Sequence, residues 1–105
     1  TQLPWWKRLG PVDLGRLGEP EERLLMRQLL RFPMVLSSCA YHLEPHGVIV
    51  YLQKLAELFH VFYTKHRVVT DELSRSRARL ALVGATRWVL ANGLRVIGVS
   101  APRRM

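Results

Sequence analysis

The sequence predicts an all-α protein, an antiparallel bundle of four or five helices that forms one domain. The 105 residues fit a single domain in length. The 49% of hydrophobic residues is ordinary for a globular domain and too high for a disordered chain. Apolar residues recur with helical spacing in four segments, whereas the alternation that is typical of strands is scarcely seen.

The first residues are expected to be a lead-in rather than part of the bundle. Helix-breaking residues crowd this stretch: Pro4, Gly10, Pro11, Gly15, Gly18 and Pro20. We therefore place a linker at residues 1–12 and the helical domain at residues 13–105. Trp5 and Trp6 stand before Lys7 and Arg8, and we favour packing of the two rings against the bundle over a role in binding.

The first helix is expected in "EPEERLLMRQLLRF". Pro20 suits a first helical position, and Glu21 and Glu22 complement the positive end of the helix dipole. Pro33 restricts the residue before it, so it ends this helix and begins a second one, "PMVLSSCAYHLE". Pro45 in the same way ends the second helix and begins a third. The two prolines predict two sharp corners in the chain, and short corners favour antiparallel packing of neighbouring helices. The apolar face of the first helix is formed by Leu24, Leu25, Leu29 and Phe32.

The third helix, about Pro45 to His66, has the clearest apolar pattern. Spacings of three and four residues give a broad core-facing stripe. Its members are Val48, Leu52, Leu55, Phe59, Phe62 and His66, widened by Tyr51, Leu58 and Tyr63.

The fourth helix is expected from about Asp71 to Asn92. Its apolar residues point in nearly every direction, which predicts a buried central helix. Gly93 follows and suits the left-handed cap conformation, so the helix should stop there. The segment "LRVIGVSAP" should then return along the bundle, extended or as a short helix.

Charge is spread unevenly along the chain. Residues 1–60 carry seven Lys/Arg and six Asp/Glu, whereas residues 61–105 carry nine Lys/Arg and only Asp71 and Glu72. A basic half predicts a polyanionic partner, although the same imbalance also serves solubility alone. Arg75 and Arg79 share a helix face, with Arg77 on another. Cations at a helix start oppose the dipole, so we expect an anion beside them: a phosphate, or a carboxylate of a neighbouring domain.

Several classes of function are excluded or disfavoured. The single cysteine, Cys39, rules out an internal disulfide, and His42 and His46 lack further ligands for zinc, so we predict no metal site and no cofactor in this domain. We expect no catalysis by this chain alone, because no phosphate loop or nucleophile motif is present. The chain shows no stretch of about 20 uncharged apolar residues and no secretory signal, so we expect a cytoplasmic location without a membrane partner.

Aromatic and basic residues meet in "HVFYTKHRV". Tyr63 precedes Lys65, His66 and Arg67 at a helix end, a combination that stacks unpaired bases and meets phosphates. The alternative is that Tyr63 belongs to the core, as Phe59 and Phe62 should. The spacing leaves both interpretations open.

The segment "RARLALVGATRWVLANGLRVIGVSAPRRM" resembles the carboxyl-terminal end of arginyl-tRNA synthetases, with their Asn-Gly-Leu break and terminal Arg-Met. Upstream, "EERLLMRQLLRFP", "EPHGVIVYLQKLAELFHVFY" and "HRVV" resemble the same family in the same order. The resemblance covers about Asp13 to Met105. It implies the all-helical anticodon-binding domain of a class I synthetase, often called the DALR domain. The HIGH-like and KMSKS-like motifs of the family's catalytic domain do not occur here.

The resemblance implies a partner and a site. The partner is the anticodon loop of tRNA(Arg), and the full enzyme would join arginine to this tRNA with ATP and magnesium, through a catalytic domain in the same chain. Tyr63 and Met105 match positions that contact the anticodon region, with the chain end folded back onto the bundle. Arg104 matches the penultimate arginine of the family, whereas Arg103 stands where the family usually has Glu.

If the resemblance holds, we expect Tyr63 to stack on a base, the Met105 side chain and free carboxylate to contact a base edge, and the arginines to meet phosphates. The predicted tRNA-binding residues are therefore Tyr63, Arg67, Arg103, Arg104 and Met105. Such a domain is expected to be a monomer. The alternatives are a detached helical adaptor that binds a protein or RNA, with an apolar patch around Trp5, Trp6 and Trp88, and a DNA-binding helix-turn-helix. The latter is disfavoured because its recognition helix needs a polar face.

Overall fold

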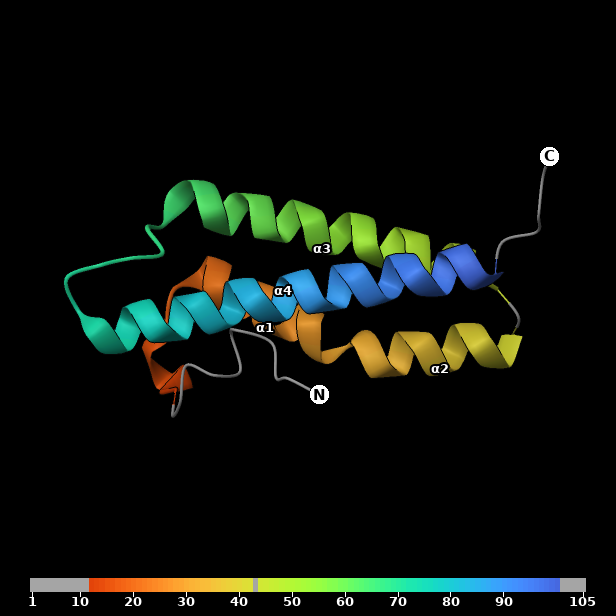
Figure 1. Cartoon of the computed structure of the whole chain (residues 1–105), viewed down its shortest axis with the longest axis horizontal. Helices are drawn as coiled ribbons and strands as arrows, with labels where there is room; N and C mark the ends of the chain where they lie inside the picture. Colours follow the sequence, from red (N-terminus) through yellow and green to blue (C-terminus); the bar gives the residue numbers. More distant parts are fainter. Residues whose placement is uncertain (1–11, 43, 101–105) are drawn as a thin grey trace.

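The computed structural model describes residues 12–42 and 44–100, with residues 99 and 100 described by their backbone alone. Within these ranges the chain is all-α and contains no strand, which confirms the predicted class. One 3₁₀ turn precedes four α-helices (Figure 1): η2 (Leu14–Arg16), α1 (Pro20–Leu30), α2 (Phe32–His42), α3 (His46–Lys65) and α4 (Leu73–Ser100).

The four α-helices form a three-helix bundle, because α1 and α2 together make one of its three helical layers. The expected bundle of four or five packed helices is therefore wrong. α1 and α2 are separated by Arg31 alone and run end to end along one side of the bundle, while α3 runs back and α4 runs forward again (Figure 1). The sharp corner expected at Pro33 is therefore wrong. Pro33 lies in the first turn of α2, where a missing N–H is tolerated, and the Val35 N–H still donates to the Arg31 carbonyl at 3.0 Å.

The start of α1 at Pro20 is confirmed. The backbone N–H of Glu19 donates to Oε1 of Glu22 at 3.0 Å, so a side chain of the first turn reaches back to the residue before the helix. Glu21 and Glu22 occupy this first turn, as expected from the helix dipole. Both carboxylates also have partners from other helices, which the sequence pattern did not indicate.

The central helix is α3 rather than α4. α3 contacts α1, α2 and α4, and it contributes the largest share of the buried apolar residues: Val48, Tyr51, Leu52, Leu55 and Phe62. α4 contributes Ala78, Leu82 and Val89 to the same core, but Trp88 and Leu94 on its other side are 43% and 61% exposed. The expectation that α4 is buried on all sides is therefore wrong, since apolar residues also cover its solvent face.

Gly93 does not end α4, as the sequence had suggested, because the helix continues for seven more residues to Ser100. A Cβ atom on Gly93 would lie 2.7 and 2.8 Å from the two methyl carbons of Leu52 on α3. Gly93 therefore permits close contact of two helices instead of providing a cap. The "LRVIGV" residues are helical, and Ile97 packs against the core.

A reciprocal pair of hydrogen bonds joins α1 to α3. The Tyr51 hydroxyl donates to the Gln28 carbonyl, and Nε2 of Gln28 donates to the Tyr51 carbonyl at 3.4 Å. Burial raises the pKa of Tyr51 to about 12, because the phenolate would lose its hydration. These bonds fix the register of α1 against α3 near the end of α1.

Part of α4, Leu73–Gly98, is long and apolar enough to span a membrane by length and composition alone, with a mean hydropathy of 1.3. Core helices of soluble proteins have the same properties, and α4 supplies Ala78, Leu82 and Val89 to a core shared with α3. The helix is therefore weak evidence for a membrane span.

Candidate nucleic-acid interface

Tyr63 lies near the end of α3 with 58% of its surface exposed. Its ring stacks on that of Phe59, with the ring centroids 5.6 Å apart and the planes 26° apart, so one face is supported by the protein. Phe62, its neighbour in the sequence, is fully buried. Of the two interpretations left open by the sequence, the structure supports the surface position for Tyr63.

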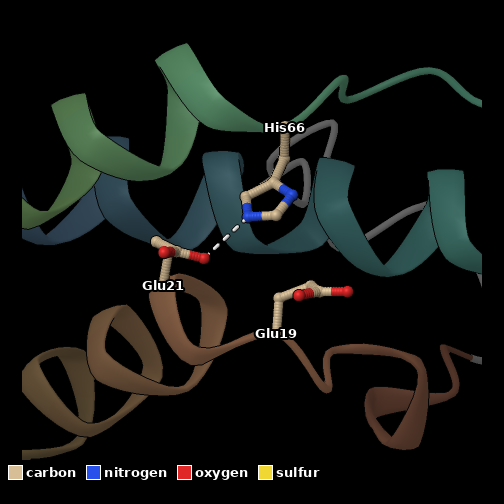
Figure 2. A group of neighbouring side chains, drawn as sticks. All are labelled: Glu19, Glu21 and His66. Atoms are coloured by element: carbon tan, nitrogen blue, oxygen red, sulfur yellow. Dashed lines mark hydrogen bonds and ion pairs between the residues drawn. The ribbon is translucent and has the colours of Figure 1, made fainter.

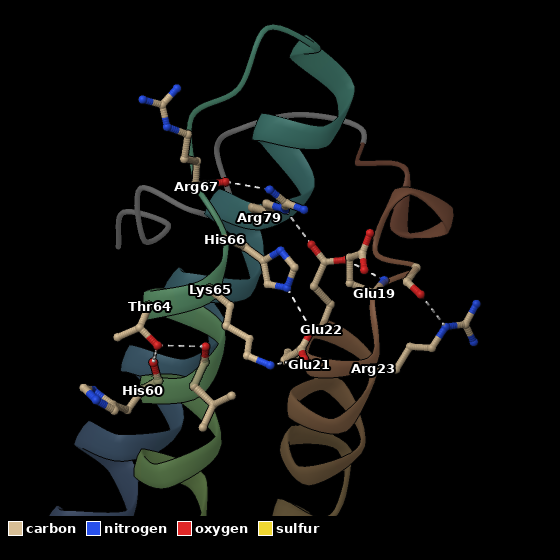
Figure 3. A network of polar contacts seen from close by, with 12 residues as sticks. Glu19, Glu21, Glu22, Arg23, His60, Thr64, Lys65, His66, Arg67 and Arg79 are labelled. Atoms are coloured by element: carbon tan, nitrogen blue, oxygen red, sulfur yellow. Dashed lines mark hydrogen bonds and ion pairs between the residues drawn. The ribbon is translucent and has the colours of Figure 1, made fainter.

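The residues that follow Tyr63 are held by the first turn of α1. Oε2 of Glu21 lies 3.3 Å from Nζ of Lys65, and Oε1 of Glu21 lies 2.9 Å from Nε2 of His66 (Figure 3). The hydrogen bond from His66, followed by the backbone N–H of Glu21 and by Lys65, lowers the pKa of Glu21 from 4.5 to about 2. The His66 ring also stacks on Phe62 at 5.9 Å. One carboxylate thus ties the end of α3 to α1.

A second carboxylate, that of Glu22, is linked to Arg67 through the side chain of Arg79. Nε of Arg79, on α4, lies 2.5 Å from Oε2 of Glu22, and Nη1 of Arg79 donates to the Arg67 carbonyl at 2.7 Å. The Glu22 side chain is fully buried and that of Arg79 is 7% exposed. In Figure 3 this chain of contacts links α1, α4 and the segment after α3. Three consecutive residues, 65 to 67, are therefore fixed from α1 and α4.

The Arg67 side chain points away from this network (Figure 3) and is exposed. In the part of the chain that the structure describes, no carboxylate lies within ion-pair distance of it. Residues 63–69 line a shallow, open depression on this surface. Tyr63 and Arg67, two of the predicted tRNA-binding residues, therefore lie on one exposed surface with the stacking face and the free cation that single-stranded RNA requires.

The remaining basic residues at the start of α4 divide into two groups. Arg79 has the predicted anionic partner, but it is a carboxylate of the same domain, Glu22, rather than a phosphate or a neighbouring domain. Nη2 of Arg75 lies 3.4 Å from Oε1 of Glu72 in an exposed pair, whereas Arg77 is exposed beside Val12. The acidic residues of the first half of the chain thus neutralise part of the basic second half.

Glu19, Glu21 and His66 form a group of residue types that bind metals, with one potential ligand atom from each within 4.8 Å of the others. Figure 2 shows the hydrogen bond between Glu21 and His66, with Glu19 beside them. Because Glu21 also pairs with the Lys65 ammonium, the arrangement is an ion-pair cluster, and a dication would have to displace that cation. His42 and His46 are exposed on α2 and α3. The prediction of no metal site stays a prediction.

Three predicted site residues, Arg103, Arg104 and Met105, lie outside the described residues, as do Trp5 and Trp6. The last described residue can be placed along the bundle. Gly93 of α4 contacts Leu52 of α3, and the two helices run in opposite directions (Figure 1). Tyr63 lies near the carboxyl end of α3 and Ser100 is the last residue of α4, so the two residues lie on opposite sides of this contact. At 1.5 Å per residue, Ser100 is about 27 Å from Tyr63 along the axis.

The sequence pattern missed the ion pairs that surround this site. Glu21 and Glu22 were interpreted only as partners of the helix dipole, and Arg79 only as a candidate for an external anion. A buried charge is paired in nearly all proteins, so an acidic residue at a core-facing position of α1 and an arginine at a core-facing position of α4 were the available signal. Which pairs form depends on tertiary structure.

The fold and the site together define a class: a small helical domain that presents an exposed aromatic ring and an exposed arginine at the end of one helix. A family model described as "DALR anticodon binding domain" matches residues 10–105. The chain belongs to the DALR anticodon binding domain family. No solved structure gives a significant match.

The chain is similar to proteins named arginine–tRNA ligase. It is 52% identical over 97 residues to the one from Methylibium petroleiphilum, 48% over 97 residues to that of Delftia acidovorans and 50% over 97 residues to that of Syntrophotalea carbinolica. Each alignment covers 92% of this chain but only 17–18% of the relative. Nothing in these comparisons favours the adaptor interpretation, and the chain spans about a sixth of the length of the relatives it matches.

Proposed function

We propose that this domain binds the anticodon loop of tRNA(Arg) as part of an arginyl-tRNA synthetase. The observation that carries the proposal is the exposed Tyr63 ring beside the exposed Arg67 side chain, in a chain of the DALR anticodon binding domain family. The similarity to arginine–tRNA ligases supports the choice of tRNA. The domain contributes recognition, and the ligation of arginine belongs to the rest of the longer enzyme.

In the proposed mechanism a base of the loop stacks on the free face of Tyr63, while Phe59 supports the other face at 5.6 Å. Arg67 meets a phosphate next to that base, because its side chain points outward and its backbone is fixed by Arg79. Arg103, Arg104 and Met105 are proposed to contact the same RNA. The five residues after Ser100 span at most about 18 Å when extended, which is less than the separation of about 27 Å between Ser100 and Tyr63 along the axis. Tyr63 and Met105 could therefore share a single pocket only if α4 ended before Ser100.

ATP and magnesium are assigned to the rest of the synthetase. The pairing of Glu21 with Lys65 supports this assignment for magnesium, because a dication at Glu19, Glu21 and His66 would have to displace the ammonium. The catalytic domain is the proposed intramolecular partner, and we propose a cytoplasmic monomer that has no membrane or DNA partner.

Stacking by Tyr63 is tested with Tyr63→Ala and a tRNA(Arg) anticodon stem-loop. We expect binding to weaken by about 1–3 kcal/mol with unchanged helicity, because one base loses its stacking partner. Tyr41→Ala is the matched control, since Tyr41 is 84% exposed on α2. Equal affinities of the Tyr63 variant and the unchanged protein would refute the stacking role, as would an equal loss in the control.

The role of the chain end is tested by deleting Arg103 to Met105. We expect loop affinity to fall more than thermal stability, with a smaller dependence on salt because two arginines are lost. A lowered Tm with unchanged affinity would show that these residues serve only the fold.

A further inference from the structure

We propose that the buried Glu22–Arg79 pair is a positioning unit that fixes the backbone of Arg67 for RNA binding. The inference rests on the proposed function and deepens it, because it assigns a role in recognition to two residues that no RNA can touch. Both side chains are buried, and the outward side of the unit is the Arg67 carbonyl.

The unit connects three segments through four polar atoms. Oε1 of Glu22 accepts from the Glu19 N–H at 3.0 Å, and Oε2 of Glu22 lies 2.5 Å from Nε of Arg79. Nη1 of the same guanidinium donates to the Arg67 carbonyl at 2.7 Å. Because the guanidinium is planar, fixing Nε on Glu22 also fixes the direction of Nη1. The start of α1 therefore determines where the Arg67 carbonyl lies.

The position of this carbonyl matters for the side chain on the same residue. Arg67 follows His66, the C-cap residue of α3, so the helical hydrogen bonds of α3 no longer hold its backbone. With the carbonyl bound on the inside, the Arg67 side chain points out, four residues beyond Tyr63 (Figure 3). Ordering a backbone residue costs conformational entropy. The bond from Arg79 orders residue 67 when the domain folds, so RNA binding does not have to order it.

Stability alone is a weak reason for such a pair. Two buried charges lose their hydration, and apolar residues of similar volume are often as good or better for stability. An apolar replacement cannot, however, donate to the Arg67 carbonyl. This difference separates a positioning role from a purely structural one.

The test uses the double substitution Glu22→Leu with Arg79→Met in the 105-residue chain. We expect a Tm close to that of the unchanged protein, because removal of two buried charges offsets the lost bond to the Glu19 N–H, and an affinity for the anticodon stem-loop that is about tenfold lower. Hydrogen exchange of residues 64–69 should become faster. Leu82→Met, a volume-conserving change of a buried residue on the same helix, is the control and should leave affinity unchanged.

A second variant, Glu22→Gln, should show the opposite pattern. It removes the negative charge and lowers stability, but Arg79 can still donate to the Arg67 carbonyl, so affinity measured well below the Tm should stay within about twofold. If affinity follows stability in both variants, or if the double variant binds as well as the unchanged protein, the positioning role is wrong. If the unchanged protein does not bind the stem-loop at all, the proposed function itself fails.

Discussion

The two ends of the bundle are built on different physical principles. At the end where α1 begins and α3 finishes, which we call the latched end, ion pairs and hydrogen bonds join Glu21 and Glu22 to Lys65, His66 and Arg79. At the other end, the apolar end, α3 and α4 approach closely at Gly93 and Leu52. An open, mainly apolar depression lies there among α2, α3 and α4, lined by Leu36, Cys39, Ala40, Glu44, Pro45, Val48 and Val96.

The two kinds of contact differ in how accurately they fix the positions of side chains. Apolar contacts are not directional, so the apolar end only has to fit in shape. Hydrogen bonds and ion pairs fix angles and distances. The latched end carries Tyr63 and Arg67, whose relative placement decides whether one RNA segment can reach both.

The largest effect on stability is expected from breaking the buried pair at the latched end. Glu22→Ala leaves the Arg79 charge buried without its partner, which should cost about 3–5 kcal/mol of unfolding free energy in urea titration. Domains of this size have only about 5–15 kcal/mol in total. Glu57→Ala is the matched control: its exposed pair with Lys54, at 3.7 Å, should be worth less than about 1 kcal/mol. Similar losses in the two variants would contradict the distinction.

At the apolar end the largest expected effect comes from Gly93→Ala. The new Cβ would lie 2.7 Å from a buried methyl carbon of Leu52, and overpacking of this kind costs about 1–3 kcal/mol even though alanine favours a helix. Gly98→Ala, on the same helix with no atom of the described residues within 4 Å of its Cβ, should instead stabilise by about 0.5–1 kcal/mol. Thermal unfolding of both variants checks the comparison, and a stabilising Gly93→Ala would show that α3 and α4 are not in tight contact.

A smaller effect is expected from Arg67 on RNA binding. Arg67→Gln removes one phosphate contact, which should reduce the slope of log affinity against log salt by about 0.7 for a single strand. Stability should not change, because Arg79 bonds to the backbone and not to the side chain of this residue. Fluorescence titration at several salt concentrations measures the slope; an unchanged slope would remove Arg67 from the site.

The smallest expected effect is a dependence of stability on pH at Glu21. Its pKa is lowered from 4.5 to about 2 in the folded protein, so the stabilisation is fully present above about pH 4.5 and is lost as the pH falls toward 2. Glu21→Gln should therefore flatten the decline of unfolding free energy between these pH values. A decline of the same steepness in both proteins would mean that Glu21 does not latch α3 to α1.

Much of the fold could be predicted from local signals. Pro20 with its acidic neighbours predicted the start of α1, and the apolar spacing of "GVIVYLQKLAELFHVFY" predicted α3 within a residue at each end. Gly93 was interpreted wrongly, since close contact with Leu52 and not a helix cap explains the glycine. Pro33 was interpreted correctly as a break between two helices, because α1 ends at Leu30 and α2 begins at Phe32. Only the sharp corner expected there was wrong, because the two helices run end to end. For the site, the sequence indicated Tyr63 and Arg67 but could not choose between surface and core for the tyrosine.

The sequence by itself determined the helical class, the family and the excess of positive charge, because composition, periodicity and motif order are properties of the chain. Only the tertiary structure decided which charges remain free. Glu22 and Arg79 are 57 residues apart, and whether they neutralise each other depends on how α1 packs against α4. The same packing turns the Arg67 side chain outward, because a hydrogen bond to its carbonyl needs a donor that arrives from a distant helix.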